Sequence, residues 1–122
     1  AAEARPGYAD ALREQGGQVL EIPERGGHLD LAALLTALGK GDAGAPIQSL
    51  LVEGGPGLSS ALLAAGLVDR FSCFIAPRIL GGGQRSVQLA PPTRMSEARA
   101  WADPTWETVG DDVLFTGWRL AI

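Results

Sequence analysis

Residues 50–83 read LLVEGGPGLSSALLAAGLVDRFSCFIAPRILGGG, and this stretch decides the fold because a helix-like segment joins two strand-like ones. The mainly apolar segment 47–52 (IQSLLV), which overlaps the start of this stretch, predicts a mostly buried strand. A turn over 53–55 then leads to Pro56, which suits the first position of a helix, and Gly66 ends that helix. A strand, a glycine turn and a helix in this order are typical of α/β proteins.

The segments on either side continue the alternation. Apolar residues at helical spacing predict one helix over 7–15 and another after Asp30, whose side chain can cap it, with a short strand over 18–23 between them. Residues 68–77 predict the second strand of the opening stretch, and the tail 105–122 predicts a hairpin. The order therefore predicts a mostly parallel sheet with flanking helices and an antiparallel C-terminal hairpin.

Length and composition limit the functional classes. The 122 residues suffice for one domain with a core, so we expect 1–122 to be a single domain. A net charge of −4 argues against a general nucleic-acid binder, which needs a basic face. With one cysteine (Cys73) and one histidine (His28), a Cys/His zinc site lacks ligands, and we expect no metal and a reducing compartment, the cytoplasm. No apolar run approaches the ~20 residues of a membrane span.

The glycine turn is the candidate ligand site. In open parallel sheets, ligands bind beyond the carboxyl ends of the strands. Gly54 and Gly55 lack the Cβ atoms that would hold a ligand away from the backbone, and a helix that starts near Pro56 offers free N–H groups to an anion such as a pyrophosphate. Glu53 can accept hydrogen bonds from a substrate. A tight turn without a ligand explains the same residues, since GGPGLSS matches neither G-x-G-x-x-G nor the Walker A pattern.

Two further blocks of sequence, together with the stretch 50–83, resemble a known family. GGHLDLAALLTALGK (26–40), the stretch 50–83 and the ending VGDDVLFTGWRL (109–120) resemble the reductase half of the bacterial bifunctional riboflavin-biosynthesis deaminase/reductase. This resemblance implies a dihydrofolate-reductase-like α/β fold, which we expect to be incomplete at the N-terminus in this chain. It also implies NADPH-dependent reduction of the ribose ring of 5-amino-6-(5-phosphoribosylamino)uracil to an open ribityl chain.

The resemblance also implies site residues. By position, Glu53 would contact the substrate. The glycine-led segment after it would contact the cofactor: Gly55, Pro56, Gly57, Leu58, Ser59, Ser60 and Ala61. A hydride acceptor must lie against the nicotinamide, and a glycine-rich rim permits that approach. The sequence identifies no catalytic proton donor.

The chain differs from the family in extent. Nothing in it matches the first half of the family's reductase domain, and the zinc deaminase motifs H-x-E and P-C-x-x-C are absent from the sequence. We therefore expect a C-terminal portion of a reductase domain, assembled as a homodimer. Two alternatives stay open: a reductase of the same fold with another substrate, and a non-catalytic structural or dimerisation module whose apolar surface a second copy covers.

Three residues outside the turn are better explained by packing than by a catalytic or binding role. Cys73 alternates with apolar residues, which predicts a small buried core residue. Trp106 and Trp118 are predicted in the core or at a subunit interface. A loop that the three glycines 81–83 open is predicted to reach residue 102 or so.

Overall fold

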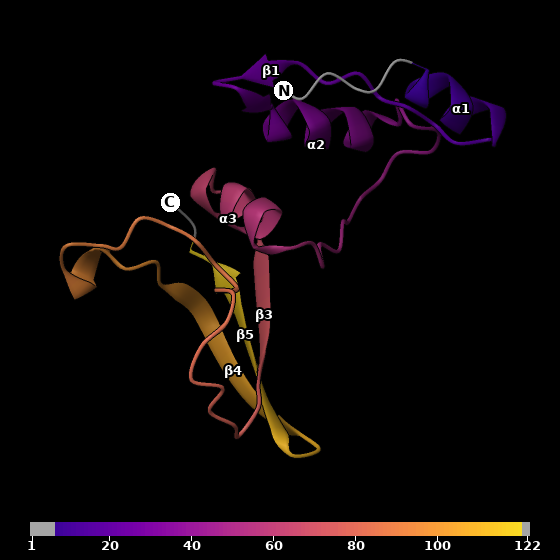
Figure 1. The fold of residues 1–122 in the computed structure, drawn as a ribbon. Helices are drawn as coiled ribbons and strands as arrows, with labels where there is room; N and C mark the ends of the chain where they lie inside the picture. Colours follow the sequence, from indigo (N-terminus) through magenta and orange to yellow (C-terminus); the bar gives the residue numbers. More distant parts are fainter. Residues whose placement is uncertain (1–6, 121–122) are drawn as a thin grey trace. The chain divides into compact units, whose positions relative to one another are not determined.

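The computed structural model describes residues 7–120, and the chain divides into two units, Ala1–Leu51 and Val52–Ile122. Figure 1 shows the elements of each unit in chain order. The first unit holds two helices and a two-stranded ladder, and the second holds one helix and a three-stranded sheet. That residues 1–122 form a single domain stays a prediction.

The helices of the first unit form where local signals predict them. They are α1 (Tyr8–Glu14) and α2 (Leu31–Lys40), so both predicted helices are confirmed. The predicted strand over 18–23 is wrong: the ladder lies further along the chain, in β1 (Glu24–Arg25) and β2 (His28–Leu29). The two glycines between these strands both have positive φ, 62° and 82°, and a two-residue turn of this kind fixes an antiparallel register around itself.

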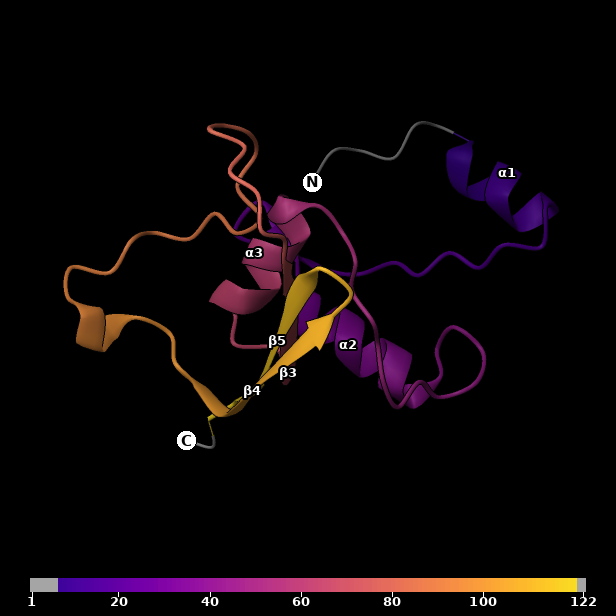
Figure 2. The ribbon, with the colours of Figure 1, turned by 90° about the horizontal axis from the view of Figure 1, so that it is seen from below.

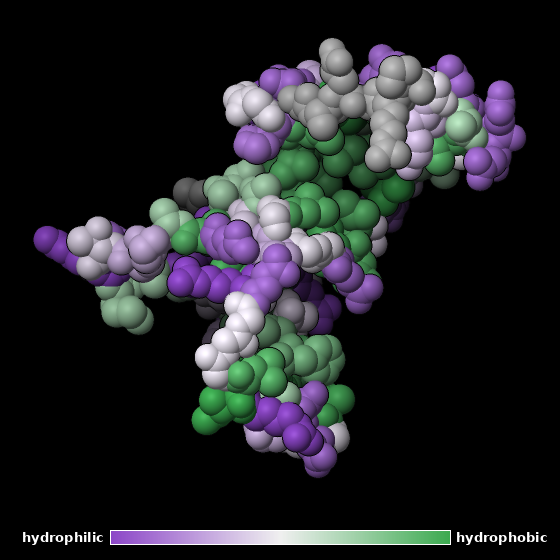
Figure 3. Space-filling view, in the orientation of Figure 1, coloured by the Kyte–Doolittle hydropathy of each residue, from purple (hydrophilic) through white to green (hydrophobic). Residues whose placement is uncertain are grey.

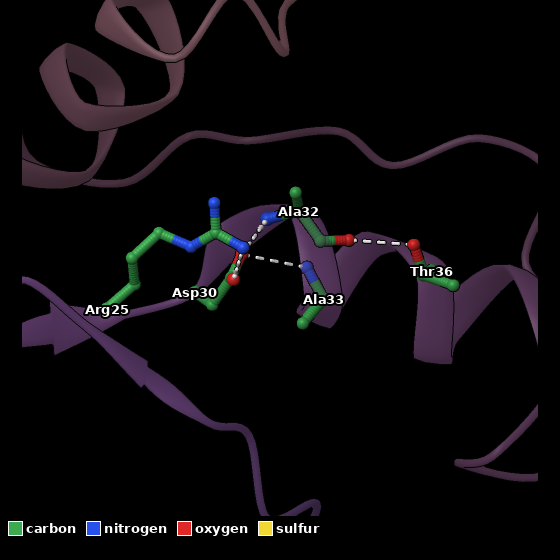
Figure 4. A network of polar contacts seen from close by, with 5 residues as sticks. All are labelled: Arg25, Asp30, Ala32, Ala33 and Thr36. Carbon is green, nitrogen blue, oxygen red and sulfur yellow. Dashed lines mark hydrogen bonds and ion pairs between the residues drawn. The ribbon is translucent and has the colours of Figure 1, made fainter.

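Asp30 caps α2 through the geometry that its position predicts (Figure 4). Its Oδ1 accepts hydrogen bonds from the backbone N–H groups of Ala32 and Ala33, each at 3.1 Å. Its Oδ2 lies 2.8 Å from Nη2 of Arg25, on β1. The pKa of the Asp30 carboxyl lies below its ordinary value. The largest cause is the hydrogen bond from the N–H of Ala33, and the positive charge of Arg25 acts in the same direction, while partial desolvation opposes them.

This cap predicts a pH-dependent loss of stability. A carboxyl whose pKa is lower in the folded state stabilises the fold above its ordinary pKa, near 4, and loses that contribution as the pH falls through the folded value. We expect Asp30→Ala to lower the thermal midpoint at pH 7, followed by circular dichroism at 222 nm. The difference from wild type should shrink steadily below about pH 4. Asp30→Asn retains a capping oxygen and serves as the uncharged control. A difference of equal size at pH 7 and pH 3 would contradict this account.

The second unit contains the predicted helix, strand and hairpin. The helix is α3 (Pro56–Ala64), and the sheet consists of β3 (Arg70–Ile75), β4 (Trp101–Val109) and β5 (Asp112–Arg119). A 3-10 turn, Met95–Glu97, lies in the loop before β4. Strand β5 lies between β3 and β4 and is antiparallel to both (Figures 1 and 2).

The predicted strand over 47–52 is wrong. This segment joins no ladder among the described residues, and the side chains of Ile47 and Leu51 are 40% and 82% exposed. The backbone N–H of Ile47 instead bonds to the carbonyl oxygen of Leu38, in the last turns of α2, at 3.0 Å. An apolar run becomes a strand only where a neighbour pairs with its backbone groups. The parallel pairing that the alternation predicted is therefore not found within residues 7–120, where both sheets are antiparallel.

Aromatic side chains hold one face of the sheet together. The ring of Phe71 stacks on Trp101 at 5.2 Å between centroids, and Phe115 lies 4.8 Å from Trp106 and 6.3 Å from Phe71. Cys73 lies opposite Phe115 and is half-buried, so its prediction as a small buried core residue is wrong. The reason is that this face is only partly covered in the described structure.

The two tryptophans of the hairpin are not core residues. Trp106 is 64% exposed and Trp118 is 47% exposed, and Trp118 lies under the guanidinium of Arg70, 5.3 Å from the ring centroid. Each lies on a short sheet with which the helix of this unit makes little contact, since α3 lies by one end of the sheet (Figure 1). The alternative prediction, a role at a subunit interface, stays a prediction.

An arginine ties the end of the sheet to the start of β3. The guanidinium of Arg119 donates to the carbonyl oxygen of Gly66 at 2.8 Å and lies 2.9 Å from the carboxylate of Asp69. The backbone N–H of Arg119 also bonds to the carbonyl oxygen of Asp69, at 2.7 Å. These contacts fix the turn that follows α3, and so help to position the helix that carries the candidate site.

Candidate functional site

The candidate site begins at the glycine turn before α3. Gly55 is the residue that precedes the helix, in an extended conformation (φ −63°, ψ 173°), and no side chain caps the helix. Pro56 has no N–H group, and the first amide that finds an acceptor in the helix is that of Ser59, bonded to the carbonyl oxygen of Gly55 at 3.2 Å. The amides of Gly57 and Leu58 have no acceptor within residues 7–120. Two donors at the positive end of a helix therefore remain available to an anion.

The space beside the glycines of the turn is open. A Cβ atom added at Gly55 or at Gly57 would meet nothing within 4 Å. At Gly54 it would approach Cδ2 of Leu58 at 3.0 Å, the far end of a flexible side chain. The corner is therefore accessible, and at Gly55 and Gly57 nothing in the fold itself requires the absence of a side chain.

Glu53, the predicted substrate contact, lies in the same unit just before this corner. Its side chain is exposed, and it forms no hydrogen bond or ion pair with any described residue. A carboxylate in this state can accept hydrogen bonds from hydroxyl or amine groups of a ligand. The structure thus leaves the acidic group free for the role that the resemblance implies.

The two serines of α3 have different partners. The hydroxyl of Ser59 donates to the carbonyl oxygen of Gly54 at 3.3 Å, which ties the helix to the turn. Ser60 is buried, with 7% of its surface exposed, and its Oγ accepts a hydrogen bond of 2.7 Å from the backbone N–H of Gln88. The other predicted cofactor residues on the helix, Leu58 and Ala61, are exposed.

Sequence reasoning missed Gln88. It contributes only its backbone N–H, a group that every residue except proline carries, so no side-chain pattern could have revealed it. The loop in which it lies was recognised only from its glycines.

A cavity near the helix lies away from the glycine turn. It is open and mainly apolar, has a volume of about 660 Å³, and lies between Ala64 at the end of α3 and loop residues 87, 89–92 and 97–99. None of the predicted site residues lines it. The chemistry of its walls offers few polar groups, whereas the turn offers free amides and a carboxylate, so the turn is the better candidate for a charged ligand.

The described residues show neither a metal site nor a spanning helix. Within residues 7–120, no three His, Cys, Asp or Glu side chains gather in a way that could hold a metal ion. In the same part of the chain, no helix has the length and apolar character needed to cross a membrane.

Comparisons with known proteins agree on one family. The model of the RibD C-terminal domain matches residues 3–115. The riboflavin biosynthesis protein RibD of Escherichia coli (strain K12) is 41% identical over 97 residues, which are 79% of this chain and 25% of that protein. RibD of Actinobacillus pleuropneumoniae is 33% identical over 107 residues, which are 86% of this chain and 27% of that protein.

A solved structure extends the match to three dimensions. Acinetobacter baumannii RibD, form 1, superposes with a TM-score of 0.75 at 27% identity, over 93% of this chain and 30% of that one. The α/β fold predicted from the sequence is thereby confirmed, and so is the resemblance to the reductase part of the deaminase/reductase. The chain spans between a quarter and a third of the length of these relatives. Since the family model covers most of its residues, the chain belongs to the RibD C-terminal domain family.

Proposed function

We propose that this chain is part of a reductase that uses NADPH to convert 5-amino-6-(5-phosphoribosylamino)uracil into its ribityl form in riboflavin biosynthesis. Family membership supports the reaction class. The observation that carries the proposal is the open corner, where three glycines, two unbonded amides and an unpaired carboxylate lie within six consecutive residues, 53–58. Such a group of donors with one acceptor suits an anionic cofactor beside a hydroxyl-rich substrate.

The residues of the corner fit NADPH because the space around Gly55 and Gly57 is open and two backbone amides there have no acceptor. When bound there, NADPH supplies the hydride. The amides of Gly57 and Leu58 would hold an anionic oxygen of the cofactor, and the bare backbone of Gly55 would let it lie close to the main chain. Glu53 would orient the substrate by accepting hydrogen bonds from its hydroxyl or amine groups. The whole segment 55–61 is the proposed cofactor site.

A homodimer in the cytoplasm is part of the same proposal. Large apolar side chains come to the surface on one face of the sheet, among them Ile75 at 48% and Trp106 at 64% exposure, and Figure 3 shows hydrophobic residues gathered over the lower end of the sheet. A second copy that covers them would remove this area from water. A lone cysteine, Cys73, suits a reducing compartment.

The same exposed side chains favour the second candidate, a non-catalytic dimerisation module. In that case the sheet would still pair with a second copy, while the glycine corner would hold no ligand. The two candidates therefore differ at the corner and agree on the sheet.

A titration separates the two candidates. We expect the chain to bind NADPH saturably at submillimolar concentration, measured by isothermal titration calorimetry. The amide resonances of residues 55–61 should shift most in NMR spectra recorded alongside. Sedimentation velocity of the same sample tests the dimer. The absence of binding at millimolar NADPH, together with a dimer, would favour the module and overturn the reductase proposal.

A further inference from the structure

Strand β3 lies at one edge of the three-stranded sheet, and no described residue pairs with its outer side. The order of the sheet is β3-β5-β4, so within residues 7–120 the strand β3 has a single neighbour, β5. Figure 1 shows β3 at the margin of the sheet, with β4 beyond β5. An edge of this kind presents a row of N–H and C=O groups to which a further strand can bond.

One backbone hydrogen bond establishes which groups of β3 face outward. The N–H of Arg119 bonds to the carbonyl oxygen of Asp69 at 2.7 Å, and these two residues continue the register of β3 and β5 by one pair. In an antiparallel ladder, hydrogen-bonded pairs alternate with pairs that are not hydrogen-bonded. The residues of β3 whose backbone groups bond to β5 are therefore Phe71, Cys73 and Ile75. Those whose backbone groups point away from β5 are Arg70, Ser72 and Phe74.

The outward donors of β3 are unused. Neither the N–H of Ser72 nor that of Phe74 has an acceptor within residues 7–120. Both residues are exposed, so water can reach these groups. A strand that pairs with β3 would replace this water with main-chain hydrogen bonds.

The two edges of the sheet differ in the features that protect an edge from pairing. Strand β4 contains Pro104, and its register with β5 shifts between Ala102 and Thr105. Natural edge strands use proline and such irregularities to prevent pairing with another strand. Strand β3 (RFSCFI) has neither feature, and its register with β5 is continuous from Arg70 to Ile75. Strand β4 thus has the features of a true edge, whereas β3 has those of an inner strand.

The side chains of β3 also fit an inner strand. Phe74 is 62% exposed, and Ile75, which points to the opposite face of the sheet, is 48% exposed. Strands inside α/β sheets are apolar on both faces because other elements cover both faces. In the described structure β3 has this pattern of side chains without the cover that it implies.

The comparisons indicate where a further strand comes from. Acinetobacter baumannii RibD matches 93% of this chain, but the match is 30% of that protein, so most of the relative lies outside it. The relative confirms an α/β fold, yet both sheets described here are antiparallel. Parallel strands are usually joined through a helix, and β3 directly follows α3. Strand β3 is therefore the place where a parallel neighbour from the unmatched part fits.

We propose that the outer edge of β3 is a docking surface for a strand from the part of the reductase that RibD relatives carry outside the region matched by this chain. The incoming strand bonds to the outward groups of Ser72 and Phe74 and extends the sheet beyond β3. Main-chain hydrogen bonds supply the affinity in such strand addition, and side chains on both faces supply the fit. The proposal goes beyond the proposed function and does not depend on where NADPH binds.

Amide hydrogen exchange in two proteins tests this edge. In the 122-residue chain, we expect the N–H groups of Ser72 and Phe74 to exchange at least tenfold faster than that of Cys73, which bonds to β5. In full-length RibD of Escherichia coli, the amides at the positions aligned with Ser72 and Phe74 should be as strongly protected as the one aligned with Cys73. Fast exchange at these two positions of the full-length protein would overturn the proposal.

The concentration of the 122-residue chain separates the proposed strand from a second copy at the same edge. If the strand comes from outside the matched region, exchange at Ser72 and Phe74 should stay fast at low and at high protein concentration. Protection that appears as the concentration rises would assign this edge to a second copy and overturn the proposed occupant.

Proline substitution checks the direction of the backbone groups. Because proline has no N–H, Ser72→Pro removes an outward donor, whereas Cys73→Pro removes a donor that bonds to β5. In the 122-residue chain, Ser72→Pro should lower the thermal midpoint by less than half as much as Cys73→Pro. In full-length RibD of Escherichia coli, the two corresponding substitutions should lower the midpoint by similar amounts. A milder effect at the position aligned with Ser72 in that protein would show that the edge stays free there and would contradict the docking of a strand.

Discussion

Replacing Gly57 by alanine should stabilise the chain and, at the same time, weaken its binding of NADPH by tenfold or more. Gly57 lies in the first turn of α3, its φ is not in the left-handed region, and an added Cβ would meet nothing within 4 Å. Alanine is the better helix former, by roughly 0.5–1 kcal/mol in a helix interior. The same methyl group would occupy the space in which a phosphate must approach the free amides, and a tenfold loss of affinity corresponds to about 1.4 kcal/mol.

The opposite signs of these two effects make the test decisive. Urea unfolding gives the free energy of unfolding, and calorimetric titration with NADPH gives the affinity. Gly39→Ala is the matched control, since Gly39 lies in α2 and its added Cβ would also meet nothing within 4 Å. The Gly39→Ala variant should raise the free energy of unfolding and leave the affinity for NADPH unchanged. A Gly57→Ala variant that gains stability and binds NADPH as tightly as wild type would show that this glycine serves no ligand.

The elements that sequence reasoning located correctly have their signals within a few residues. Asp30 before the apolar face of α2, Pro56 at the start of α3 and Gly66 after its end each act on the adjacent backbone, so they work in any surrounding structure. The hairpin of β4 and β5 is also local, because Gly110, with φ of 62°, allows the turn that sets its register.

The elements that sequence reasoning misplaced depend on residues far away along the chain. The run 47–52 has the composition of a buried strand, but composition cannot supply the neighbouring strand that it needs. The side chain of Leu51, in this run, is 82% exposed. The same limit applies to the candidate site. Its position follows from consecutive residues, whereas the bond between Ser60 and Gln88 joins residues 28 positions apart and depends on the path of a loop.

Gly117→Ala should destabilise the three-stranded sheet by about 1–3 kcal/mol, the cost of forcing extra volume into a packed site. The added Cβ would lie 2.6 Å from Cβ of Trp101 and 3.2 Å from Cζ of Phe115. The first of these atoms is close to the backbone of β4, so it cannot move away unless the strand moves. The Trp101 ring is moreover stacked on Phe71 with an angle of 16° between the planes, and a shift of β4 would separate the two rings.

Urea unfolding followed by tryptophan fluorescence measures the loss of stability, and near-ultraviolet circular dichroism reports the separation of the Trp101 and Phe71 rings. The midpoint should fall, and the aromatic circular dichroism of the folded state should weaken as the stack loosens. Gly82→Ala is the control, because Gly82 lies in the loop with nothing within 4 Å of its added Cβ and should be close to neutral. Glycine usually weakens the middle of a strand, since it has no side chain to pack. At position 117 the side chain of Trp101 fills the space that a side chain of residue 117 would occupy. An unchanged unfolding midpoint in Gly117→Ala would mean that β4 does not lie this close to β5 near the pair Ala102↔Trp118.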